Sequence, residues 1–285
     1  MTDALSAVLR AGSFVFLLQA AGIALFDAIF GRQLACSRTW IRATGQRVAL
    51  AGLVLVGAHY ALEAARMAGE LSGMFDTSMQ AIVWGTSVRA AWIARTVGLA
   101  LIAIGLGSTR LTSVALSLVG AALATIAFTL TGHTTVSTYR GELAALLEIH
   151  LLIVAFWLGA LAPLYVISGR EAPARAAAII ERFSAVATWL VPGILVAGTA
   201  MAFLLIPSLS VFAEPYGELL LVKVTGFALL MGLAAANKWR LGPAIAGGSR
   251  QAVRRFRRSI GAEGVLIVVV LAATAVMTAF FSAEP

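Results

Sequence analysis

Residues 141–167 read GELAALLEIHLLIVAFWLGALAPLYVI, and this stretch decides the fold. A bilayer core of about 30 Å needs about 20 mainly apolar residues in a helix, so the stretch is long enough to cross a membrane. The whole chain agrees, because 60% of its 285 residues are hydrophobic and 12% are charged, against roughly 45–50% and about 25% in soluble domains. The sequence therefore predicts a protein whose solvent is largely lipid.

Seven further runs of this kind surround the first. They are continuous rather than alternating, which excludes a transmembrane β-barrel and predicts an all-α integral membrane protein of eight transmembrane helices. No soluble domain interrupts them, so residues 1–285 are expected to form one membrane domain. A similar placement of Arg95 and Lys223 in their spans indicates two four-helix halves, or equally the chance placement of cations near helix ends. The expected spans are 12–30, 46–67, 88–107, 110–131, 141–167, 182–206, 217–237 and 260–281.

Basic residues alternate between the two sides of these spans. Fifteen lie in the loops after the first, third, fifth and seventh spans, and four lie on the opposite side. Since short loops rich in lysine and arginine stay in the cytoplasm, both termini are expected in the periplasm. The net charge of +8 is then explained by topology and by contact with anionic membrane lipids, and nucleic-acid binding is not needed to account for it.

All three histidines lie in the outer half of the predicted membrane region. At 1.5 Å per residue, His59 is about 12 Å and His150 about 13 Å from the outer end of its span, and His133 marks the outer end of another span. Imidazole binds copper, zinc, iron and nickel, and three convergent imidazoles without a thiolate favour copper or zinc. In the alternative, each histidine hydrogen-bonds a neighbouring helix separately.

Other polar and sulfur-containing side chains lie close to these histidines in the sequence. Glu63 follows His59 by four residues and shares its helical face. It either orients the imidazole, binds metal itself, or is a solvated helix end. The outer loop adds Met67, Met74 and Met79, whose thioethers suit Cu(I) and equally suit apolar packing.

Two cations lie inside the spans, Arg95 and Lys223, about 9–10 Å from the outer ends. Neither is expected to stay unpaired in hydrocarbon, so Glu63, Glu148 or Glu218 is the expected partner. The pairs are either purely structural, or the cations adjust metal affinity and release by repulsion.

Two polar residues near the inner side have open roles. Asp27 either pairs with Arg32 or another inner-loop arginine, or is an exit-side metal ligand. Cys36 is the single cysteine, which rules out an internal disulfide framework. It either accepts copper on the reducing side or has no metal role.

The second half of the chain carries an ordered set of short motifs, and its order and spacing resemble the copper resistance protein D (CopD/PcoD) family. The resemblance covers residues 130–285 and extends to the first half through the eight-span topology and Arg95. The motifs are Gly132-His133, Glu148-Ile149-His150-Leu151-Leu152, Phe156-Trp157-Leu158-Gly159-Ala160-Leu161, Pro163-Leu164, Arg182-Phe183-Ser184, Gly198-Thr199, Tyr216-Gly217, Lys223, Asn237 and Arg240.

The resemblance implies a bacterial inner-membrane protein of copper handling that moves copper from the periplasm inward, often with a small periplasmic copper-binding protein, CopC. The turn histidine of the pattern corresponds to His133 and the histidine of the fifth span to His150, whereas His59 is assigned by topology. This sequence contains no fused CopC-like domain. Copper would therefore arrive from a separate partner or as the free ion.

We accordingly expect a copper transporter whose outward-facing site consists of His59, His133 and His150, with Glu63, Glu148 and the loop methionines as auxiliary groups. The sequence has no P-loop or aspartyl-phosphate context, so transport is expected to be channel-like or driven by an ion gradient and the membrane potential. No catalytic triad or paired carboxylates are seen, and we do not expect an enzyme. The alternative function is electron transfer by a b-type haem held between two histidines.

Overall fold

The computed structural model describes residues 2–108, 110, 112–131, 137–206, 212 and 214–280, and His133 lies outside these ranges. The described residues form helices and no strands. Eight helical segments among them are long and apolar enough to cross a membrane, which confirms the predicted eight-span, all-α fold. The spans are α1 (Thr2–Phe30), α2 (Arg38–Ala68), α4 (Val88–Gly107), α5 (Ser113–Ile126) with η3 (Ala127–Leu130), α6 (Arg140–Arg170), α7 (Pro173–Leu190) with α8 (Pro192–Leu205), α9 (Pro215–Ala236) with η6 (Asn237–Leu241) and α10 (Gly242–Ala246), and α11 (Arg250–Phe280).

Several helices extend beyond the limits expected from hydropathy. α2 begins at Arg38 rather than at residue 46, and α11 begins at Arg250 rather than at residue 260. The added turns contain several arginines, and arginine can place its aliphatic stem along an apolar surface while its guanidinium finds water or a polar partner. The sixth span is also divided, because Pro192 cannot continue the hydrogen-bond ladder of α7 and begins α8 instead.

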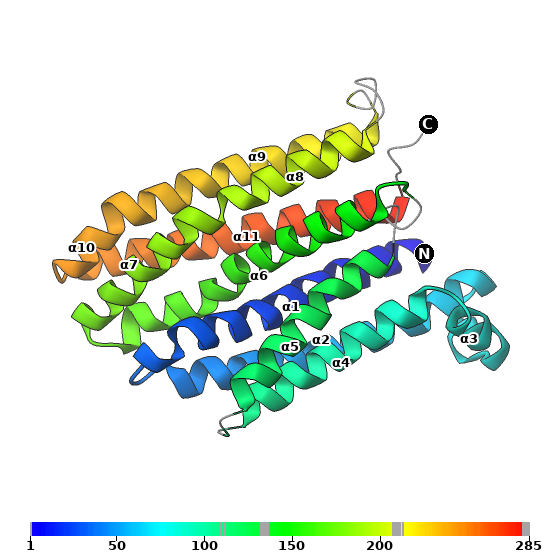
Figure 1. Ribbon diagram of the computed structural model, residues 1–285, viewed down its shortest axis with the longest axis horizontal. Coiled ribbons are helices and arrows are strands. Elements are labelled where there is room, and N and C mark those ends of the chain that lie inside the picture. The colour runs from blue at the N-terminus through cyan, green and yellow to red at the C-terminus, as the bar shows by residue number, and fades with distance from the viewer. Residues whose placement is uncertain are drawn as a thin grey trace.

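Both ends of the described chain lie at the same end of the bundle, as the even number of spans requires (Figure 1). This end also holds the short helix α3 (Thr77–Trp84), and we call it the terminal end. The opposite, loop end holds η1 (Gly31–Gln33) and α10. That the terminal end faces the periplasm stays a prediction.

α1 lies at the centre of the bundle, where it packs against α2, α5, α6 and α11. Its side chains Leu17, Leu18, Ile23 and Phe26 are fully buried. Gly22 of α1 faces Gly159 of α6, and a Cβ atom at either position would overlap the backbone of the other helix. Close approach through small residues is a common way for membrane helices to associate.

The eight spans form two groups of four. In the first group, α1, α2, α4 and α5 pack in a closed ring, each against the next. In the second, α6 packs against α7, α8 and α11, and α11 packs against α9. The groups meet where α6 and α11 contact α1, so one core joins both halves. Few residues of α8 and α9 are buried within the bundle, so much of their surface is available for lipid contact.

Candidate metal site at the terminal end

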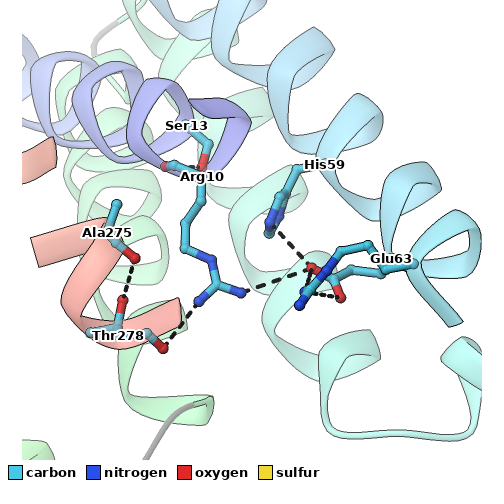
Figure 2. A network of polar contacts seen from close by, with 7 residues as sticks. Arg10, Ser13, His59, Glu63, Ala275 and Thr278 are labelled. Atoms are coloured by element: carbon cyan, nitrogen blue, oxygen red, sulfur yellow. Dashed lines mark hydrogen bonds and ion pairs between the residues drawn. The ribbon is translucent and has the colours of Figure 1, made fainter. Parts of the chain in front are cut away.

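His59 lies on α2, nine residues before the helix ends, and is 8% exposed. Its Nε2 atom is 3.4 Å from Oε1 of Glu63, one turn further along the helix (Figure 2). No group in the described part of the chain forms a hydrogen bond with this nitrogen. His59 therefore has a buried ring nitrogen beside a carboxylate, with its hydrogen-bonding capacity unused.

Glu63 is held by arginines from two helices. Nη1 of Arg66 lies 3.2 Å from Oε2 of Glu63, and Nη2 of Arg10 on α1 lies 3.9 Å from Oε1. Arg10 also donates to the main-chain oxygen of Thr278 on α11 at 3.3 Å (Figure 2). With its side chain 18% exposed, Glu63 is part of a network joining α1, α2 and α11 rather than a fully solvated helix end.

His150 lies on α6 and faces α8. Its Nδ1 atom is 3.1 Å from the main-chain oxygen of Ile194, and Gly198 of α8 lies next to the ring. Because a carbonyl oxygen only accepts hydrogen bonds, Nδ1 carries a proton, and in the neutral imidazole Nε2 then has its lone pair free. This is the arrangement in which metal-binding histidines are usually held, with the second nitrogen donating to a backbone carbonyl or carboxylate.

His59 and His150 lie on different helices in separate surroundings. α2 and α6 both pack against α1, which lies between them in the bundle. Around His59 are Glu63 and its arginines, whereas His150 contacts α8. In the described ranges, no three His, Cys, Asp or Glu side chains are close enough together to hold a metal ion. The predicted third ligand, His133, lies outside the described residues.

The methionine-containing loop folds against α2 at the terminal end. Met67 is exposed at the end of α2, Met74 lies in η2 (Leu71–Phe75), and Met79 lies in α3. η2 packs closely on α2, because Gly73 sits against the main chain of α2. The loop is therefore an ordered cover over the end of the helix that carries His59.

α3 is fixed at both ends. Asp76 is its N-cap and accepts hydrogen bonds from the main-chain N–H groups of Ser78 at 2.8 Å and Met79 at 3.4 Å. The Ser78 hydroxyl and these N–H groups hold the pKa of Asp76 below its usual value. At the other end, Trp84 packs edge-on against Trp92 of α4, with ring centroids 5.8 Å apart.

The two intramembrane cations form no ion pair within the described residues. The guanidinium of Arg95 lies 5.4 Å from the centre of the Phe128 ring, and its buried Nε has no hydrogen-bond partner in the described ranges. Glu148, one of the expected partners, instead accepts a hydrogen bond from Thr125 at 2.7 Å. Lys223 is partly buried on α9, close enough to His150 for an electrostatic interaction.

At the loop end, Asp27 pairs with inner-loop arginines, which was the first of the two alternatives that the sequence left open. Its partners are Arg38 at 3.0 Å and Arg42 at 2.5 Å, rather than Arg32. Arg42 also donates to the main-chain oxygen of Gly105, which joins α1, α2 and α4. Cys36 is exposed, and its main-chain N–H donates to Glu171.

One buried polar group was missed by the sequence analysis. Glu263 of α11 is 3% exposed and accepts hydrogen bonds from Trp157 of α6 and Asn237 of η6. A signal was present, because Glu263 is the only acidic residue in residues 250–280 and interrupts a long apolar run. As an ionisable residue within a span, Glu263 is a candidate functional residue in the same way as Asp27.

Together, the fold and these groups define a multi-pass membrane protein with buried nitrogen donors near one end. Residues 1–141 match the family model described as "Copper resistance protein D-like, N-terminal domain", and residues 177–277 match "Copper resistance protein D". The chain belongs to the copper resistance protein D family, and is thus a membrane protein related to copper resistance and transport. Among curated proteins, none matches the chain.

Proposed function

We propose that this protein transports copper ions across the bacterial inner membrane, from the periplasm to the cytoplasm, through a histidine site at the terminal end. The observation that carries the proposal is the 3.1 Å contact between Nδ1 of His150 and the oxygen of Ile194. This contact fixes the tautomer that leaves Nε2 free to bind a metal ion. Membership of the copper resistance protein D family supports copper as the ion that this site binds.

His59 supplies the second nitrogen in this proposal. Its Nε2 and Oε1 of Glu63 are 3.4 Å apart, so the pair offers two adjacent donor atoms inside the bundle. His133 follows α5 and η3 in the sequence and precedes α6, which begins at the terminal end and carries His150. We assign it as the third imidazole ligand.

The surrounding groups guide capture and release. Met67, Met74 and Met79 deliver copper as soft thioether ligands in the ordered loop over α2. Glu148 is an auxiliary acceptor. Arg95 and Lys223 form no ion pair among the described residues, so in this proposal they weaken cation binding and favour onward release. A periplasmic CopC-like protein is the proposed copper donor.

The test is copper binding by the purified protein and by His59→Ala, His133→Ala and His150→Ala. Each variant should bind less copper than the parent protein, because each removes one proposed ligand, while the copper-free protein stays folded. Trp189→Phe, on an exposed position of α7, is the control that keeps full binding. Full copper occupancy in all three alanine variants would contradict the site. A Soret band in the purified protein would instead identify haem.

Glu63→Gln tests whether the carboxylate supports His59. Removal of a group that orients a metal-binding histidine typically costs about 10–100-fold in metal affinity. We expect a loss in this range, measured by competition with a copper chelator. An unchanged affinity would remove Glu63 from the proposed site and leave it as part of the arginine network alone.

The direction of transport depends on which way the terminal end faces. The excess of basic residues in the loops at the other end favours a periplasmic terminal end. A reporter enzyme that works only in the periplasm, fused after Pro285, should therefore be active. Activity of a cytoplasm-specific reporter at the same position would reverse the proposed orientation and direction.

A further inference from the structure

Glu263 places a carboxyl group in the middle of a membrane-spanning helix. It lies 13 residues from Arg250 and 17 from Phe280, the ends of α11, or about 20 and 25 Å at 1.5 Å per residue. The residue is 3% exposed. Arg258, five residues before it on the same helix, is exposed, so the carboxyl group is buried a short distance beyond the arginine-rich turns of α11.

The partners of Glu263 are both neutral and come from two other elements. The indole Nε1–H of Trp157 on α6 donates to Oε2 at 3.0 Å, and the amide Nδ2 of Asn237 on η6 donates to Oε1 at 2.5 Å. The carboxyl group thus joins α6, α11 and the end of the α9 span. Within the described ranges no arginine or lysine forms an ion pair with it, unlike Asp27.

Ionisable groups on the elements packed against α11 are engaged elsewhere or lie toward the ends of the bundle. Lys238 of η6 donates to Thr188, and Arg257 of α11 itself donates to Ser168. In the described residues none forms an ion pair with Glu263. The others are Arg10 and Asp27 on α1, Arg140, Glu142, Glu148, His150, Tyr165 and Arg170 on α6, Tyr216, Glu218 and Lys223 on α9, Arg240 on η6, and Arg250, Arg254, Arg255 and Arg258 on α11.

Two hydrogen-bonded arrangements are open to this group. As a carboxylate, Glu263 accepts from Trp157 and from the Asn237 amide, as the structure has it. Oδ1 of Asn237 is buried and has no donor among the described residues. If the amide turns over, Oδ1 faces Glu263 and accepts the O–H of the protonated carboxyl. Both protonation states therefore keep the carboxyl group of Glu263 hydrogen-bonded to Trp157 and to one end of the Asn237 amide.

Asn237 also begins a π-helical turn, Asn237–Leu241, directly after α9. Such turns are uncommon and are found frequently at functional sites, where the helix changes its hydrogen-bond register. Trp239 and Arg240, within the same turn, are exposed. The turn therefore connects the buried amide to the surface near the loop end within a few residues.

We propose that Glu263, Trp157 and Asn237 form a proton-binding site within the membrane, and that protonation and deprotonation of Glu263 are coupled to copper movement. The coupling rests on the proposed copper transport. One O–H bond forms when the carboxylate takes up a proton from the aqueous phase on one side. The same bond breaks when the proton leaves toward the other side through the π-helical turn, and no redox change is involved.

Infrared difference spectroscopy tests the proton site without copper. Membrane-reconstituted protein, stepped between acid and alkaline pH, should show the C=O stretch of a buried protonated carboxyl that disappears at high pH and shifts in D₂O. Glu263→Gln should lack this band, and Glu181→Gln, which changes an exposed carboxylate on α7, should keep it. Trp157→Phe retains the acid but loses one donor, so it should keep the band with a shifted frequency. A wild-type spectrum identical to that of Glu263→Gln would overturn the site.

Proteoliposomes test the coupling. Vesicles with a pH indicator inside receive external copper, with or without an imposed pH gradient. In wild type, the gradient should change the rate of copper uptake and copper should change the internal pH; Glu263→Gln should lose both effects, and Glu181→Gln should lose neither. Copper uptake by wild type that ignores the gradient would overturn the coupling alone. If wild type moves no copper, the proposed function and the coupling both fail, whereas the infrared band still decides the proton site.

Discussion

Asp27 in the first half of the molecule lies against two arginines, whereas Glu263 in the second half has only an indole and an amide as partners. Both carboxyl groups are almost completely buried. The histidines differ in the same way, since His59 faces the Glu63 network and His150 donates to a main-chain carbonyl. Fixed countercharges hold one protonation state, while neutral partners permit two. The first half is thereby suited to structural charge pairs and the second to groups that change state.

The largest expected effect is that of Asp27→Asn. Breaking a buried ion pair leaves its arginines uncompensated and typically costs about 3–5 kcal/mol. We expect a loss of about 3 kcal/mol in the free energy of unfolding in detergent, because Arg42 keeps its bonds to main-chain oxygens. Glu70→Gln, at an exposed position of the same half, should change stability little. A loss below about 1 kcal/mol would mean that the Asp27 ion pairs contribute no more than exposed ones, and the contrast with Glu263 would fail.

Glu171 should show the next largest effect, because it joins the halves at the loop end. Its Oε1 accepts the main-chain N–H groups of Cys36 at 2.9 Å and Ser37 at 2.8 Å. Hydrogen bonds to a charged group contribute about 1.5–3 kcal/mol, so Glu171→Gln should lose roughly 1.5 kcal/mol at neutral pH. Unfolding in denaturant, followed by circular dichroism, measures this loss.

The loss should depend on pH in a defined direction. Burial acts to raise the pKa of Glu171, but hydrogen bonds from the main chain of Cys36 and Ser37 outweigh it, so the pKa lies below its usual value. A depressed pKa gives stability that is present above the unfolded-state pKa and lost as the pH falls through the folded-state pKa. The gap between wild type and Glu171→Gln should therefore close in acid. A gap that is constant with pH would show that the charge of Glu171 is not involved.

His150→Ala and His59→Ala compare the two halves more finely. In copper-free protein both remove the same side-chain volume, but among the described residues only His150 gives up a hydrogen bond. Hydrogen bonds between membrane helices contribute about 0.6 kcal/mol on average, up to roughly 1.7. His150→Ala should thus be less stable than His59→Ala by about 0.6 kcal/mol in thermal unfolding. Equal stabilities would mean that the Ile194 contact adds nothing measurable.

Glu263→Gln should have the smallest effect on stability, below about 0.5 kcal/mol, because glutamine still accepts from Trp157 and pairs with the Asn237 amide. The same unfolding assay measures it beside Asp27→Asn. A loss as large as that of Asp27→Asn would indicate that Glu263 depends on its charge, and the contrast between the halves would disappear.

The eight spans were predictable because each apolar run must satisfy its own backbone in lipid, which leaves little choice but a helix. The helix limits were less so, since arginine-rich turns such as those from Arg38 and Arg250 count as loops on a hydropathy scale although they continue the helix. Hydropathy also gives no sign of the π-helical turn at Asn237, which depends on local hydrogen-bond register.

The candidate site was only partly predictable. The number of residues between each histidine and the end of its predicted span placed His59 and His150 toward the terminal end. What each side chain contacts, however, depends on the rotation of its helix about the helix axis. Their separate surroundings on either side of α1 could not be derived from spacing. The partners of Glu263 lie 106 and 26 residues away, so only tertiary packing brings Trp157 and Asn237 to it.

The contact between Gly22 and Gly159 limits how the two halves can move. Two backbones meet there with no side chain between them. Sliding α1 by one turn along α6 would bring Leu18 or Phe26 against Gly159, where there is no room for either. Rotation about the contact displaces neither side chain. The glycine pair therefore opposes sliding of one half along the other, and any alternation between outward-open and inward-open shapes would have to keep this close contact.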